Sequence, residues 1–138
     1  MYLLDTNVIS ELRKKNKANT GVIAFFKKVH LEKTQLFISV ITVGELRRGI
    51  EIIRYHGDTP QAQTLEKWLE LILNDYSNNI LEFGKTEAQV WGRLRVPHHE
   101  NSLDKQIAAT ALTYGLCVVT RNADDFSGTG VEVLDPFD

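Results

Sequence analysis

The chain opens with Tyr2-Leu3-Leu4-Asp5-Thr6-Asn7-Val8, a short apolar run that ends in a carboxylate and leads into a helical pattern. Two more acids stand near the junction of an apolar run and a helical pattern. Glu45 follows a second apolar run, and Asp104 opens a helical pattern that leads into a third apolar run. In open sheets of parallel strands, the residues that follow the strands line the crevice where ligands bind. The sequence therefore predicts an α/β fold in which Asp5, Glu45 and Asp104 lie near one another.

Carboxylates gathered in such a crevice repel one another unless a cation lies between them. Mg²⁺ prefers about six oxygen ligands and keeps several waters, so two carboxylates, water and a substrate phosphate can hold it. Such an ion orients a phosphate and stabilises the charge of an in-line displacement. We expect Asp5 and Asp104 to be direct ligands. Glu45 would bind a second ion, hold a water or act as a base.

The composition limits the classes of protein to which the chain can belong. Its 138 residues predict one domain, residues 1–138, large enough to fold without disulfides. The one cysteine, Cys117, stands in an apolar run, as expected of a buried thiol in a reducing compartment. A net charge of −2 argues against a general nucleic-acid coat protein. Without a visible signal peptide or an apolar run of ~20 residues, we expect a cytoplasmic protein with no membrane partner.

Strand-like and helical segments alternate along the chain. The apolar spacing predicts strands at 2–4, 36–40, 80–83, 116–120 and 131–134, and helices at 6–12, 20–31, 86–95 and 103–114, with two more between about 42 and 74. This alternation predicts right-handed βαβ units and a mostly parallel central sheet flanked by helices. The first helix between 42 and 74 would start at Thr42, and the second has Thr59 as its expected N-cap and Pro60 at its first position. These two helices are expected to form a projecting hairpin.

Each acid also has a purely structural interpretation. Asp5 can cap a helix, Thr42-Val43-Gly44-Glu45 fits a capping box, and Asp104 suits the first turn of a helix. The joint pattern favours a site, because Asp104 shares a helical face with Ala108 and Ala111. Small residues on that face let the helix approach the sheet, so the Asp104 side chain is expected to point inward.

Four segments resemble, in order and spacing, the motifs of PIN-domain nucleases. They are Leu3-Leu4-Asp5-Thr6-Asn7-Val8-Ile9-Ser10-Glu11, Ser39-Val40-Ile41-Thr42-Val43-Gly44-Glu45-Leu46, Leu103-Asp104-Lys105-Gln106-Ile107-Ala108-Ala109-Thr110-Ala111 and Val119-Thr120-Arg121-Asn122-Ala123-Asp124-Asp125-Phe126. The arrangement is similar to the toxin ribonucleases of bacterial VapBC-type toxin–antitoxin pairs, including the FitB-like branch. The resemblance implies a PIN fold, a Mg²⁺- or Mn²⁺-dependent endoribonuclease acting on RNA, and a small inhibitory antitoxin protein. It also implies a homodimer and assembly on operator DNA through the antitoxin.

Carried over residue by residue, the resemblance assigns the family's three core acids to Asp5, Glu45 and Asp104. The family's fourth acid often lies two residues after the strand-ending Thr or Ser, where this chain has the neutral Asn122. Asp125 would supply the charge instead, with Asp124 as the alternative. The expected catalytic set is therefore Asp5, Glu45, Asp104 and Asp125.

Polar and basic residues complete the expected site. Three of them would hydrogen bond to the carboxylates and fix their orientation: Thr6, Thr120 and Asn122. Arg47 and Arg48 lie within one helical turn of Glu45 and are expected to bind RNA phosphates, with an ordinary solvated helix face as the alternative.

Two other functions are compatible with acids at the ends of strands. A receiver-like phosphoacceptor domain usually has adjacent acids after its first strand and a lysine after a late strand, whereas this chain has Thr6 and Arg121 there. A non-catalytic PIN-like binding module would lack one or more of the core acids, and this chain keeps three.

Overall fold

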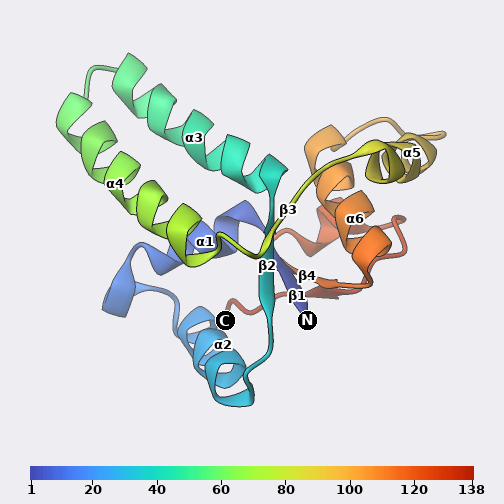
Figure 1. Ribbon diagram of the computed structural model, residues 1–138, viewed down its shortest axis with the longest axis horizontal. Helices are drawn as coiled ribbons and strands as arrows, with labels where there is room; N and C mark the ends of the chain where they lie inside the picture. Colours follow the sequence, from blue (N-terminus) through green and yellow to red (C-terminus); the bar gives the residue numbers. More distant parts are fainter.

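Five parallel strands form the centre of the molecule, and helices cover both faces of the sheet (Figure 1). The computed structural model describes the whole chain, residues 1–138. In chain order the strands are β1 (Tyr2–Leu4), β2 (Leu36–Ser39), β3 (Ile80–Leu81), β4 (Cys117–Val119) and β5 (Val133–Leu134). Their order across the sheet is β3-β2-β1-β4-β5, and every neighbouring pair is parallel. The prediction of a mostly parallel sheet flanked by helices is confirmed.

The strand order places the opening strand in the middle of the sheet. Tyr2 pairs with Leu36 of β2 on one side and with Cys117 of β4 on the other. The chain builds outward through β2 and β3, and then crosses back to add β4 and β5 beyond β1. Such a reversal opens a crevice at the carboxyl ends of the central strands. Asp5, the residue that follows β1, therefore stands at the middle of this edge.

Six helices connect the strands or follow them. They are α1 (Thr6–Leu12), α2 (Thr20–Glu32), α3 (Val40–Tyr55), α4 (Thr59–Asp75), α5 (Lys85–Leu94) and α6 (Ser102–Tyr114). Two short 3₁₀ turns, η1 (Lys15–Lys17) and η2 (Ala123–Phe126), lie in the connections. None of the helices combines the length and the apolar character needed to span a bilayer.

The two faces of the sheet are buried in separate cores, because successive residues of a strand point to opposite sides. Leu4 is fully buried in the larger core, which α1, α2, α3 and α4 complete, whereas Leu3 is fully buried against α6. Ala108 and Ala111 of α6 are fully buried in this second core. The small side chains thus let α6 press against the sheet, as predicted, and its first turn lies at the carboxyl edge.

Four helix starts differ from the sequence prediction: α5 and α6 each begin one residue earlier than predicted, and the other two differences are explained by their caps. Helix α3 begins at Val40 rather than Thr42, because the Ser39 hydroxyl accepts a hydrogen bond from the N–H of Ile41 (3.0 Å) and caps the helix earlier. Helix α4 is capped by Asp58, whose carboxylate accepts from the N–H of Gln61 (3.1 Å). Thr59, predicted as the cap, is the first residue of that helix.

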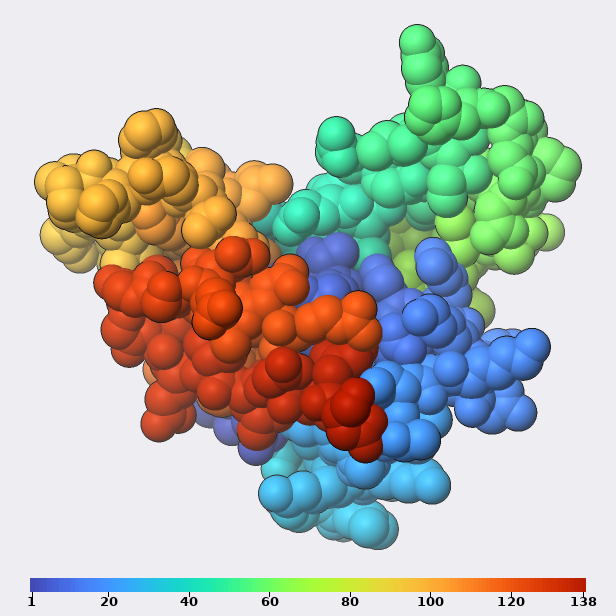
Figure 2. Space-filling model, turned by 180° about the vertical axis from the view of Figure 1, so that it is seen from behind, coloured from blue at the N-terminus to red at the C-terminus, as the bar shows by residue number.

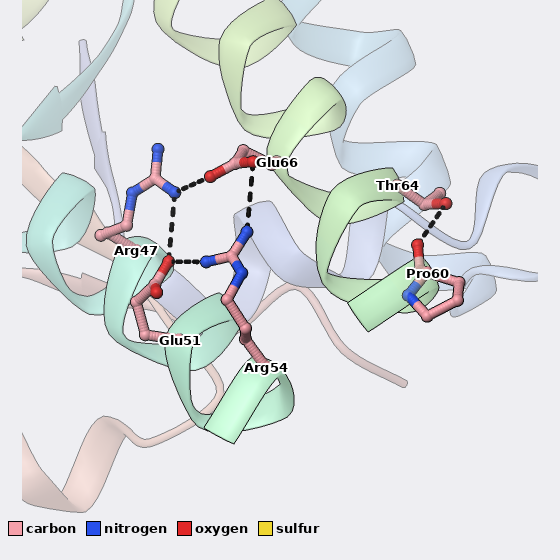
Figure 3. Close-up of polar contacts among 6 residues, drawn as sticks. All are labelled: Arg47, Glu51, Arg54, Pro60, Thr64 and Glu66. Atoms are coloured by element: carbon pink, nitrogen blue, oxygen red, sulfur yellow. Dashed lines mark hydrogen bonds and ion pairs between the residues drawn. The ribbon is translucent and has the colours of Figure 1, made fainter. Parts of the chain in front are cut away.

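Helices α3 and α4 form the expected projecting hairpin, and in the space-filling view a notch separates it from α5 and α6 (Figures 1 and 2). Four side chains join its two helices in a network of ion pairs (Figure 3). Arg47 contacts Glu66 of α4 at 2.6 Å and Glu51 at 3.4 Å, and Arg54 contacts Glu66 at 3.2 Å and also Glu51. One exposed pair contributes little to stability, but these four hold each other across the hairpin.

The C-terminal segment, residues 135–138, lies against the start of α2. Figure 2 shows this end of the chain in dark red beside the blue N-terminal part. The Asp138 carboxylate accepts hydrogen bonds from the Thr20 hydroxyl (2.8 Å) and the N–H of Gly21 (3.2 Å). A Cβ added at Gly21 would lie 2.2 Å from the carbonyl oxygen of Pro136. Glycine at this position is therefore what allows the C-terminal segment to dock.

This close approach predicts opposite effects for two glycine-to-alanine changes in helices. Gly21→Ala should destabilise the fold by about 1–3 kcal/mol, because the backbone of the C-terminal segment must move. Gly49→Ala, in the middle of α3 with open space around it, should stabilise the fold by about 0.5–1 kcal/mol through helix propensity. Urea unfolding of the two variants checks both signs. A gain in stability for Gly21→Ala would contradict the docked segment.

Candidate active site

The Asp5 carboxylate is buried at the end of β1 and is 4% exposed. One of its oxygens accepts a hydrogen bond from the N–H of Thr6 at 2.8 Å, so Asp5 does cap α1. The other accepts from the hydroxyl of Thr120, at the end of β4, also at 2.8 Å. Burial raises the pKa of Asp5, and the two hydrogen bonds oppose this rise. The capping interpretation and the site interpretation are therefore both compatible with this residue.

Asn7 connects the ends of β1 and β4, a role that the sequence analysis did not assign to it. Its amide donates to the hydroxyl of Thr120 (3.2 Å) and, at longer range, to the Asp5 carboxylate (3.4 Å). Its amide oxygen accepts from the N–H of Arg121 (3.0 Å). The sequence feature that could have indicated this role is the position of Asn7 in the first turn of a helix, two residues after an acid that ends a strand. From there its amide can reach back to the end of that strand.

Glu45 approaches Asp5 from the second turn of α3. Its carboxylate accepts a hydrogen bond from the hydroxyl of Thr6 at 3.3 Å. The capping-box interpretation of Glu45 is wrong, because Ser39 is the cap and Glu45 contacts another helix instead. Burial and then the charge of Asp5 raise the pKa of Glu45, whereas the charge of Arg48 lowers it.

Asp104 lies in the first turn of α6, half-buried, and its carboxylate accepts no hydrogen bond from the protein. Burial raises the pKa of Asp104 to about 6, with further contributions from the charges of Asp5, Asp125 and Glu45. Unlike the oxygens of Asp5, those of Asp104 are free to bind a group from outside. The charges of the other three acids all raise the pKa of Asp104, so carboxylates from four separate elements lie within electrostatic range of one another.

Of the two aspartates expected as a fourth acid, Asp125 rather than Asp124 acts on the other carboxylates. The charge of Asp125, in η2, raises the pKa of both Asp5 and Asp104. Asp124 is exposed and makes no such contribution. Asn122 contributes its backbone only, since its N–H donates to the Thr120 hydroxyl (3.0 Å) and its side chain makes no hydrogen bond.

The donor set of this site fits a hard divalent cation in atom type and charge. Carboxylate oxygens are the ligands that Mg²⁺ and Mn²⁺ prefer. Burial is the largest cause of the raised pKa values, and a cation would relieve the repulsion between carboxylates that adds to it. As the side chains stand, no three acidic, histidine or cysteine groups are close enough to hold one ion together. Binding therefore requires rotation of the half-buried carboxylates of Glu45 and Asp104 toward Asp5.

The two arginines expected to bind RNA have different environments. The guanidinium of Arg47 is committed to Glu66 and Glu51, so it holds the hairpin together (Figure 3). Arg48 is exposed and has no ion-pair partner, and its charge acts on Glu45. Of the two, only Arg48 presents a free cation beside the acids.

The chain is similar to a known domain family and to several characterised proteins. The PIN domain family matches residues 2–131 of the chain. The chain is 34% identical to plasmid stability protein StbB of Pseudomonas syringae pathovar tomato, covering 100% of this chain and 99% of that protein. It is also 34% identical to toxin FitB of Neisseria gonorrhoeae, covering 99% of each. VapC ribonuclease Y4jK of Sinorhizobium fredii is 29% identical over 100% of this chain and 99% of that protein.

Solved structures show the same fold. The crystal structure of FitAcB from Neisseria gonorrhoeae contains a chain that superposes with a TM-score of 0.85 at 33% identity, covering 99% of this chain and 98% of that one. The structure of FitAB bound to an IR36 DNA fragment gives a TM-score of 0.85 at 31% identity, covering 100% of this chain and 96% of that one.

The raised pKa of Asp104 predicts a pH-dependent loss of stability in the absence of divalent cations. Because the folded state holds this proton more tightly than the unfolded state, the penalty is absent below about pH 4 and complete above about pH 6. Asp104→Asn removes the penalty, so its thermal midpoint should exceed that of the parent by about 3 °C at pH 7.5, allowing for solvent screening. The two midpoints should converge toward pH 4.

The matched control for this measurement is Asp124→Asn, which removes an exposed charge on η2 away from Asp5 and Asp104. Its midpoint should follow that of the parent at every pH. A difference between Asp104→Asn and the parent that does not change with pH would mean that Asp104 does not share a site with the other acids.

Proposed function

The chain belongs to the PIN-domain family, and we propose that it is a divalent-metal-dependent endoribonuclease that acts as the toxin of a toxin–antitoxin pair. The observation that carries the proposal is the convergence of Asp5, Glu45, Asp104 and Asp125 on one site at the carboxyl edge of the sheet. Relatives that match the chain end to end are named as a toxin and as a ribonuclease. Burying like charges together is unfavourable, so this arrangement serves binding rather than stability.

Asp5 and Asp104 would hold the cation, with Glu45 and Asp125 beside them. When bound, a divalent ion orients the substrate phosphate and stabilises the charge that develops during in-line displacement. Thr6 and Thr120 fix the rotamer of Asp5 by donating to both of its oxygens. The half-buried carboxylate of Glu45 has a raised pKa, which suits it to take the proton of the attacking water.

The reaction follows from these roles. Water attacks phosphorus and gives a proton to a carboxylate oxygen of Glu45, the bond from phosphorus to the 3′ oxygen breaks, and the leaving 3′ oxygen takes a proton from solvent water. The products are a 5′-phosphate and a 3′-hydroxyl. Arg48, a free cation on the helix that carries Glu45, would bind a phosphate of the same RNA strand.

A groove beside the acids supports inhibition by an antitoxin. It has a volume of about 210 Å³ and runs from Thr6 and Glu45 to Leu65 and Trp68 of the hairpin. The relatives solved as FitAcB and FitAB are complexes by name. An arginine of the partner would pair with Asp5 or Asp104, and an adjoining apolar segment would fill the groove. Assembly on operator DNA through the antitoxin, and a homodimer of this chain, belong to the same proposal.

Two alternatives are less well supported. A receiver-like domain is a different family from the one to which the chain belongs. A non-catalytic PIN-like module would not need three acidic neighbours whose charges raise the pKa of Asp104.

Cleavage of RNA should depend on the acids and on a divalent cation. Asp5→Asn and Asp104→Asn should lower the cleavage rate at least about a thousandfold, because each removes charge worth several kcal/mol in the transition state. Thr120→Val should lower it about ten- to a hundredfold by releasing Asp5. Rates with Mg²⁺, with Mn²⁺ and in EDTA measure these effects, and Asp124→Asn is the control that should cleave at least as fast as the parent.

The outcome that contradicts the proposal is cleavage that persists in EDTA, or parent-like rates in both the Asp5 and the Asp104 variants. If Asp124→Asn lowered the cleavage rate as much as Asp5→Asn and Asp104→Asn do, the loss would reflect acidic charge in general and not these two positions.

The partner proposal predicts inhibition that depends on the groove. The protein encoded beside this chain should form a complex with no nuclease activity, and activity should return after the partner is proteolysed. Trp68→Ala should weaken inhibition while leaving cleavage by the free protein intact, because Trp68 lines the groove from α4, a helix that contributes no acid to the site. Full activity in saturating partner, measured by cleavage of a labelled RNA, would refute this.

A further inference from the structure

Arg121 follows β4, whereas Arg48 belongs to the helix that follows β2, so the two arginines come from strands on either side of β1. The surroundings of Arg121 differ from those of the hairpin arginines. Arg121 follows Thr120, whose hydroxyl donates to Asp5, and the N–H of Arg121 donates to the Asn7 side chain at 3.0 Å. Its backbone is therefore fixed one residue away from the carboxylate cluster. Its side chain is exposed and makes no ion pair, unlike Arg47 and Arg54.

The guanidinium of Arg121 is nevertheless held in place. It lies over the ring of Phe137, with its central carbon 3.9 Å from the ring centroid. A guanidinium that stacks on an aromatic ring uses its face and keeps the N–H donors of its edge free. Those donors match the oxygens of a phosphate, to which arginine binds in a bidentate manner. The stacking thus orients an unpaired phosphate-binding group beside the site.

Phe137 is itself fixed by the C-terminal segment. Its side chain packs against the larger core, and its N–H donates to the Asp135 carboxylate at 3.0 Å. The next residue, Asp138, bonds to Thr20 and Gly21 at the start of α2. The segment therefore connects the site rim to a helix that contributes no acid to the site.

The carboxylates around Arg121 affect how an RNA strand can approach the site. A hollow of about 360 Å³ next to the site is lined by Arg121, Asn122, Ala123, Asp124, Asp125 and Asp135. Arg121 is the one basic residue in that lining, among three carboxylates. An RNA strand that reaches the acids through this hollow would be repelled by its three carboxylates and attracted by this guanidinium alone.

We propose that Arg121 binds a backbone phosphate of the RNA next to the cleaved bond, and that Phe137 positions its guanidinium for this contact. This inference rests on the proposed ribonuclease function and adds to it a second point of contact, on the side of the site away from Arg48. Arg121 is a substrate-binding residue, and Phe137 is a positioning residue that acts through it.

The test measures binding of a fluorescently labelled, mixed-sequence single-stranded RNA by anisotropy at several salt concentrations. To prevent cleavage, all variants carry Asp104→Asn and Mg²⁺ is present. Arg121→Ala should reduce the slope of log affinity against log salt by about 0.7 and weaken binding at low salt about three- to tenfold. Arg121→Lys should keep the slope but recover only part of the affinity, because lysine neither stacks nor binds in a bidentate manner.

Two substitutions of Phe137 separate positioning from folding. Phe137→Leu keeps an apolar side chain in the core and should weaken binding a few-fold with an unchanged salt slope. Phe137→Tyr keeps the ring and should bind RNA as the parent does. Lys28→Ala removes one exposed charge from the outer part of α2 and should change neither affinity nor slope. In proteins with Asp104 intact, Arg121→Ala should raise KM with little change in kcat.

The inference is overturned if Arg121→Ala retains the parent slope, or if Lys28→Ala loses as much slope as Arg121→Ala. It is also overturned if Phe137→Leu binds RNA as tightly as Phe137→Tyr. If the parent cleaves RNA but the Arg121 and Phe137 variants bind RNA as the parent does, this inference fails and the proposed function stands. If the parent neither binds nor cleaves RNA, the proposed function fails with it.

Discussion

The carboxylate of Asp5 is buried at the end of the central strand, and most of the polar architecture around it follows from the need to satisfy its two oxygens. An unpartnered carboxylate at 4% exposure would be strongly unfavourable. Thr6 supplies one hydrogen bond from α1, and Thr120 supplies the other from β4. Asn7 bonds to Thr120 and so ties the two strand ends together. The need to hold one buried charge thus fixes the relative position of β1, α1 and β4 at the ligand-binding edge.

The other acids are held differently, and the difference suits their proposed roles. Asp104 accepts no hydrogen bond from the protein, and Glu45 accepts one long bond from Thr6. Their side chains can therefore turn toward an ion or a water, whereas the orientation of the Asp5 carboxylate is fixed by its hydrogen bonds. The hairpin brings Glu45 to this edge from one side. On the other side, the C-terminal segment holds Phe137 and, through it, Arg121.

Features that depend on local pattern could be predicted from the sequence, and features that depend on distant partners could not. The strands, the helices, the hairpin and the parallel sheet follow from apolar spacing, and the buried face of α6 follows from Ala108 and Ala111. The family resemblance predicted which acids form the site, but it could not predict the pairing of Arg47 with Glu66, because that contact depends on how α3 and α4 pack. The stacking of Arg121 on Phe137 joins a residue that follows β4 to one that follows β5, so no local pattern could predict it. The cap at Ser39 was missed because Thr42 offered a rival local pattern.

The central claim is that the carboxylates of Asp5, Glu45, Asp104 and Asp125 form a site for a divalent cation. Calorimetric titration of Mn²⁺ into the protein at pH 6, in two buffers with different heats of ionisation, tests it most directly. The account predicts saturable binding with release of protons, because Asp104 titrates near this pH and must lose its proton to bind the ion. Heats that match dilution alone, or binding that releases no protons at pH 6, would contradict it.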